Sequence, residues 1–107
     1  MPIPKNYTEF QHSLVAATPQ GEWPDSLCAM WYDVKGDWDK AHNIGQDIHS
    51  ALGSWIHGYL HIKEGDEFNA RYWYNRAKRK YPVQGLEAEQ KEIVEYILKL
   101  FNNPNTP

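Results

Sequence analysis

The chain has 107 residues, which is enough for one domain with a hydrophobic core and too few for two. Hydrophobic residues make up 41% of the chain and charged residues 23%, so extensive disorder is excluded. The net charge of −3 argues against a protein that binds nucleic acid or an anionic membrane surface, because both classes need an excess of basic residues.

The single cysteine, Cys28, excludes a framework of intramolecular disulfides. The first ten residues lack the apolar run of a secretory signal peptide. No window of the sequence approaches the roughly 18 consecutive apolar residues of a membrane-spanning helix. We therefore expect a cytoplasmic protein that has neither a membrane nor a nucleic acid as its partner.

Apolar residues recur at intervals of three and four without sustained alternation, so the sequence predicts a single all-α domain of about six helices over residues 1–107. In chain order we predict a first helix over 7–17, helical hairpins over about 25–49 and 50–81, a C-terminal helix over about 86–101 and a disordered tail over 102–107. Pro19 and Gly21 should end the first helix. The last helix of the second hairpin is expected to reach Lys80.

A Gly-Asp pair occurs twice, at the start of GDWDKA from Gly36 and of GDEFNA from Gly65, with an offset of 29 residues between the two glycines. In each pair the glycine is suited to end one helix and the aspartate to cap the next. Ser50 can cap the helix that lies between the two pairs. Because the helix boundaries repeat together with the Gly-Asp-x-x-x-Ala pattern, the sequence predicts two helical hairpins stacked in series.

The second hairpin resembles a tetratricopeptide unit, in which small, turn-forming, aromatic and proline positions recur at fixed spacing. The matching residues are Gly58, Gly65, Ala70, Tyr74, Ala77 and Pro82. The first hairpin departs from this pattern, since Gly45 stands where the family has an aromatic residue. The resemblance implies two stacked tetratricopeptide-like hairpins with flanking N- and C-terminal helices, and a surface that binds a protein or a peptide.

The segments GDWDKAH and WIHGYLHIKEGDEFNARYWYNRA are also similar to small bacterial and fungal proteins with no assigned activity, over about Leu27 to Lys80. That similarity implies no catalytic residues. An array of helical repeats normally needs about three units. The first and last helices should therefore act as caps, or the chain should form a homodimer.

His57, His61 and Glu64 lie on one stripe of the fourth predicted helix, at i, i+4 and i+7. Two imidazoles and a carboxylate at this spacing can bind a metal ion, and Asp39 or His42 from the preceding helix could join them. However, a chain this short with five histidines contains such pairs by chance, and the HExxH motif is absent. We therefore expect no metal or other cofactor. If a metal binds, the candidate ligands are His57, His61, Glu64 and Asp39.

Two arguments disagree on whether His57 and His61 face solvent. They lie opposite the apolar stripe of their own helix, which favours exposure. The tetratricopeptide register instead places them with Gly58, inside the hairpin. A glycine within a helix costs about 1 kcal/mol relative to alanine and usually marks the close approach of another helix, so we favour burial. The candidate hydrogen-bond partners of a buried imidazole are Tyr72, Tyr74 and Asp66.

Phe68 and Tyr72 lie opposite the predicted core face of the fifth helix, so this helix is either sandwiched between neighbours or exposes an apolar patch. Stacked hairpins favour the sandwich. No recognisable nucleophile elbow or glycine-rich phosphate loop is present, so we do not expect an enzyme. We expect a protein- or peptide-binding module; the alternative is a metal- or small-ligand-binding protein. The candidate binding residues are His42, His57, His61, Phe68 and Tyr72.

Overall fold

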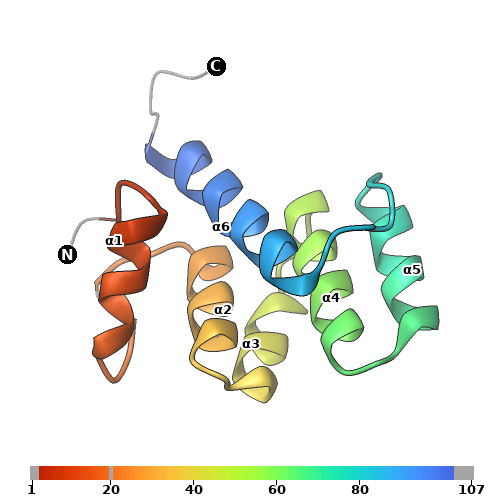
Figure 1. The fold of residues 1–107 in the computed structure, drawn as a ribbon, viewed down its shortest axis with the longest axis horizontal. Helices are drawn as coiled ribbons and strands as arrows, with labels where there is room; N and C mark the ends of the chain where they lie inside the picture. The colour runs from red at the N-terminus through yellow and green to blue at the C-terminus, as the bar shows by residue number, and fades with distance from the viewer. Residues whose placement is uncertain (1–2, 20, 103–107) are drawn as a thin grey trace.

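The computed structural model describes residues 3–19 and 21–102, which form an all-helical fold (Figure 1). Its elements are α1 (Tyr7–His12), the 3₁₀ turn η1 (Ser13–Val15), α2 (Asp25–Val34), α3 (Trp38–Gly45), α4 (Ala51–Lys63), α5 (Glu67–Arg76) and α6 (Leu86–Asn102). The predicted all-α class with about six helices is confirmed. Within the described ranges, no helix is long and apolar enough to span a membrane.

Several predicted helix ends differ from the structure. The first α-helix ends at His12 and is followed by the 3₁₀ turn η1. This turn ends at Val15 because Ala16 is extended. The third helix ends at Gly45, and residues 46–49 form the turn to α4. The fifth ends at Arg76 instead of Lys80. In the predicted tail, Asn102 is the last residue of α6, whereas 103–107 lie outside the described residues.

Two helical hairpins form the body of the fold. Helix α2 packs against α3, and α4 packs against α5, so each hairpin consists of sequence neighbours. Helix α4 also contacts α2, α3 and α6, which makes it the central helix. Helix α6 runs back across α2 and α4 and meets α1 near the start of the chain (Figure 1).

The two Gly-Asp pairs end and begin helices as predicted. Gly36 and Gly65 have φ angles of 92° and 83°, in the left-handed region that glycine adopts readily. The side chain of Asp37 accepts a hydrogen bond from the Lys40 N–H at 3.1 Å. The side chain of Asp66 accepts one from the Asn69 N–H at 3.2 Å. Each aspartate therefore satisfies an N–H group in the first turn of the helix that follows.

Two buried carboxylates join α6 to the hairpins. Glu89 of α6 accepts hydrogen bonds from the Trp55 indole at 2.8 Å and the Tyr74 hydroxyl at 2.7 Å. Asp33 of α2 accepts hydrogen bonds from three donors. They are the Tyr59 hydroxyl at 2.8 Å, the Lys63 ammonium at 2.7 Å and the Gln90 amide at 3.0 Å. Because both carboxylates are buried and hydrogen-bonded, they fix the arrangement of α2, α4, α5 and α6 around one core.

Helices α4 and α5 approach closely at Gly58. A Cβ atom at this position would lie 2.7 Å from Tyr74 Cδ2 and 3.2 Å from the Ala70 carbonyl oxygen. Tyr74 is only 1% exposed, so its ring has little room to move. The close approach that the glycine predicts is therefore present, and it places the Gly58 side of α4 inside the hairpin.

We expect Gly58→Ala to destabilise the protein by on the order of 1–3 kcal/mol through overpacking against Tyr74. Helix propensity alone would change stability in the opposite direction by up to about 1 kcal/mol. Urea denaturation measures the net effect. Gly45→Ala is the control, because its Cβ would lie 3.3 Å from the nearest atom, Ile56 Cγ2, and needs a shift of only a few tenths of an ångström. A midpoint for Gly58→Ala at or above that of the wild type would contradict the close packing.

Candidate functional site

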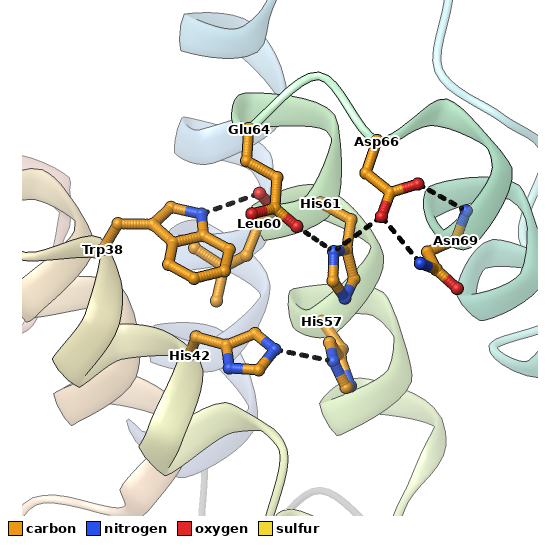
Figure 2. A network of polar contacts seen from close by, with 8 residues as sticks. All are labelled: Trp38, His42, His57, Leu60, His61, Glu64, Asp66 and Asn69. Carbon is orange, nitrogen blue, oxygen red and sulfur yellow. Dashed lines mark hydrogen bonds and ion pairs between the residues drawn. The ribbon is translucent and has the colours of Figure 1, made fainter.

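Three histidines meet between the two hairpins. His42 comes from α3, and His57 and His61 come from successive turns of α4 (Figure 2). A potential metal-binding nitrogen of each ring lies within 4.8 Å of those of the other two. His57 is 8% exposed, and the other two rings are partly buried. The site is therefore a compact imidazole cluster at the junction of the hairpins.

Local helix geometry and one helix contact bring the rings together. The four-residue spacing of His57 and His61 stacks their rings, with centroids 4.8 Å apart and planes 22° from parallel. His42 reaches them because α3 packs against α4 one turn later, where Gly45 faces Ile56. The cluster therefore depends on the packing of the first hairpin against the second.

The ring nitrogens of the cluster have the following hydrogen-bond partners. His42 Nε2 and His57 Nε2 are 3.0 Å apart, so in the neutral rings one of these atoms carries the hydrogen and the other accepts it. His61 Nδ1 donates to Glu64 Oε1 at 2.6 Å, and Asp66 Oδ2 lies 4.0 Å from the same nitrogen. The Nε2 edge of His61 faces His57 (Figure 2).

Two tryptophans form walls of the cluster. The Trp38 ring stacks on His42 with centroids 4.7 Å apart, and its indole N–H donates to the Leu60 carbonyl at 2.8 Å. The Trp73 ring stacks on His57 with centroids 4.1 Å apart. These indoles remove water from the imidazole faces and restrict the rotation of His42 and His57.

Burial keeps the two central imidazoles neutral. Burial, followed by the neighbouring His42 and His61, lowers the pKa of His57 from 6.5 to about 4. Burial is also the main cause that lowers the pKa of His42; His61 lowers it further, whereas Glu64 and Asp39 act in the opposite direction. At neutral pH both rings are therefore in the form that can coordinate a metal ion.

The residues that could surround a metal ion differ from the predicted set. His57 and His61 lie together, but Glu64 contacts the Nδ1 edge of His61 instead of converging with His57. Asp39 is exposed on α3 and is not part of this group, whose third member is His42. A second possible group consists of His61, Glu64 and Asp66.

The other predicted binding residues lie elsewhere. Phe68 and Tyr72 are 84% and 49% exposed on the outer side of α5, outside the histidine cluster, so the expected sandwich is wrong for these side chains. The tyrosine partners suggested for a buried imidazole are also wrong. The Tyr74 hydroxyl donates to Glu89, the Tyr72 hydroxyl accepts from Arg76, and His57 is paired with His42.

Sequence reasoning missed Trp38 and Trp73 as walls of the site. One local signal was present for Trp38, because it precedes His42 by four residues and such pairs face each other on a helix.

Comparison of the chain with protein-family models, with curated proteins and with solved structures gave no match. The resemblance to tetratricopeptide units therefore stays a sequence-based prediction, and the cluster is interpreted from its own chemistry.

The lowered pKa of His57 makes the stability of the metal-free protein depend on pH. Above pH 6.5 the ring is neutral in both states and contributes no pH dependence. Between pH 6.5 and 4 the unfolded chain binds a proton and the native ring does not, so stability falls as pH falls, by up to about 1.4 kcal/mol per pH unit. Urea midpoints between pH 7.5 and 5, with a chelator present, measure this slope.

His57→Gln should flatten the dependence on pH, whereas His49→Gln, at an exposed histidine outside the cluster, should leave it unchanged. Equal slopes for the wild type and His57→Gln would show that His57 is protonated in the native state.

Proposed function

We propose that the protein binds a transition-metal ion of the zinc class through His42, His57 and His61. The observation that carries this proposal is the convergence of three ring nitrogens within 4.8 Å, with the His61 ring held by Glu64 at 2.6 Å. Three imidazoles suit zinc, copper or nickel, whereas magnesium and calcium prefer oxygen ligands.

The distance between the His42 and His57 rings is close to that of a bound site. Tetrahedral zinc with Zn–N bonds of 2.0–2.1 Å separates neighbouring ligand nitrogens by about 3.3 Å. His42 Nε2 and His57 Nε2 are 3.0 Å apart and hydrogen-bonded. For a metal ion to take the place of the shared hydrogen, that hydrogen must move to the Nδ1 atom of its ring. The two Nε2 atoms would also separate by a few tenths of an ångström, and both rings would rotate to point their lone pairs at the ion.

Glu64 has the role of an orienting group in this proposal. Histidines that bind a metal commonly donate their other ring N–H to a carboxylate, which fixes the tautomer and makes the ligand nitrogen more basic. His61 donates its Nδ1–H to Glu64, which leaves Nε2 as its coordinating atom. Asp66 Oδ2 lies 4.0 Å from the same His61 Nδ1 atom, and it accepts a hydrogen bond from the Asn69 side-chain amide at 2.6 Å.

Three protein ligands leave a fourth position open, as in catalytic zinc sites. The site can therefore polarise a bound water molecule or a ligand oxygen. A purely structural cluster explains the arrangement less well. Burying imidazoles away from water destabilises the fold, and apolar side chains would fill the same space without that effect.

Zinc titration of protein prepared without a His tag should show one equivalent bound and a raised melting temperature. Alanine at His42, His57 or His61 should each weaken zinc binding by about 100-fold or more, and Glu64→Gln by about 10-fold or more. His49→Ala is the matched control and should bind zinc as the wild type does.

Sub-stoichiometric zinc and an unchanged melting temperature would refute the metal proposal. Zinc binding that survives His42→Ala but is lost in Asp66→Asn would instead place the ion between His61, Glu64 and Asp66.

We propose protein or peptide binding by the outer side of α5 as a second candidate function. The exposed rings of Phe68 and Tyr72, one helical turn apart, favour it, because exposed aromatic side chains are common at interfaces. A second copy of the chain is one partner that this surface could bind.

If α5 mediates self-association, light scattering should give a mass above that of a monomer at high protein concentration, and Phe68→Ser should return it to the monomer. Val15→Ser is the control, since Val15 is 93% exposed in another part of the fold. A monomeric wild type at all concentrations would remove the homodimer from this proposal.

A further inference from the structure

A pocket of about 570 Å³ lies beside the histidine cluster. Its walls are the turn from α3 to α4, the first turn of α4 and the C-terminal end of α5. His57 and Trp73 line it on the side of the cluster, so the pocket and the proposed metal site share the His57 ring. Arg76 and Lys78 line it on the side of α5.

The charges around this pocket are opposite in sign to the net charge of the chain. Two cationic side chains line it and no aspartate or glutamate does, although the protein carries a net charge of −3. Among the described residues, no carboxylate forms an ion pair with Arg76 or Lys78. The Arg76 guanidinium lies 5.6 Å from the centroid of the Trp73 ring, and its Nη1 donates a hydrogen bond to the Tyr72 hydroxyl at 3.3 Å.

The backbone at Lys78 gives a second observation. Its φ angle is 59°, and among the described residues it alone has a positive φ without being glycine. Three helices end with the same pair of hydrogen bonds, and the left-handed residue is Gly36 after α2, Gly65 after α4 and Lys78 after α5. Glycine makes this cap without strain. Lysine rarely adopts this conformation. At position 78 it places a positive charge both at the C-terminal end of α5 and beside the pocket.

We propose that this pocket binds a small oxyanion, either a phosphate or a carboxylate group, next to the proposed metal ion. Arg76 and Lys78 would neutralise its charge, and the first turn of α4 adds the positive end of a helix dipole. The side chains that line the pocket, and not the metal ligands, would bind the oxyanion. Because His57 borders both sites, the bound oxyanion would lie beside the proposed metal ion.

The test is an NMR titration of the metal-free, ¹⁵N-labelled protein with inorganic phosphate, and in parallel with acetate. The Trp73 indole N–H and the amides of Ala51 and Gly53 report on the pocket. We expect saturable shifts at these three signals. The tighter of the two anions identifies the oxyanion that the pocket prefers.

Three substitutions at Lys78 separate its charge from its backbone strain. Lys78→Gln removes the charge and keeps the strain, so phosphate binding should weaken by about tenfold without a gain in melting temperature. Lys78→Gly should weaken phosphate binding by the same factor and raise the melting temperature of the ligand-free protein. Lys78→Arg should retain binding.

Arg76→Gln should weaken phosphate binding as Lys78→Gln does. The matched control is Lys80→Gln, because Lys80 is a nearby exposed lysine that does not line this pocket. Shifts that do not saturate, or that Lys80→Gln reduces as much as Lys78→Gln, would overturn the oxyanion site.

Zinc titration of the same variants keeps the two proposals apart. Phosphate binding lost in Lys78→Gln with zinc binding retained supports both. Zinc binding without any phosphate binding overturns only the oxyanion site, and phosphate binding without zinc binding overturns only the metal site.

Discussion

The packing of Tyr74 on the backbone of Gly58 determines the position of most other groups in the second hairpin. With a ring carbon 2.7 Å from where a Cβ would lie, Tyr74 packs closer to the α4 backbone than any residue other than glycine at position 58 would allow. That approach brings the adjacent Trp73 onto the face of His57. It also carries the Tyr74 hydroxyl to Glu89, which ties α6 to the hairpin. The absence of a side chain at Gly58 therefore determines the positions of both Trp73 and α6.

The fold class and the hairpin turns could be predicted because their signals are local. A helix period, a left-handed glycine and a capping aspartate each act within a few residues, as at Gly36 and Gly65. The end of α5 was missed for the complementary reason. Lys78 makes the same left-handed turn, and its sequence gives no sign of a conformation that lysine rarely adopts. Two hydrogen bonds close this turn, from the Lys78 N–H to the Asn75 carbonyl and from the Arg79 N–H to the Tyr74 carbonyl.

The candidate site was only half predictable, because its two halves depend on interactions of different range. The spacing of His57 and His61 on one helix stacks their rings whatever surrounds them. His42 joins them only through the contact between α3 and α4, which no local spacing specifies. For Glu64, spacing gives proximity to His61 but not which ring nitrogen is contacted. Because Glu64 contacts Nδ1, the proposed metal site gives it the role of an orienting group in place of a ligand.

Two features that lower stability lie at the same pocket and have unrelated physical causes. One is the removal of neighbouring imidazoles from water, and the other is the strained backbone of Lys78. Proteins commonly break local rules at functional sites, and here His57 and Lys78 line one pocket. A dication at the Nε2 atoms and an anion in the adjoining pocket would attract each other across the His57 ring. Linkage requires that each raise the affinity for the other by the same factor, so His57 would be the group through which the two sites are coupled.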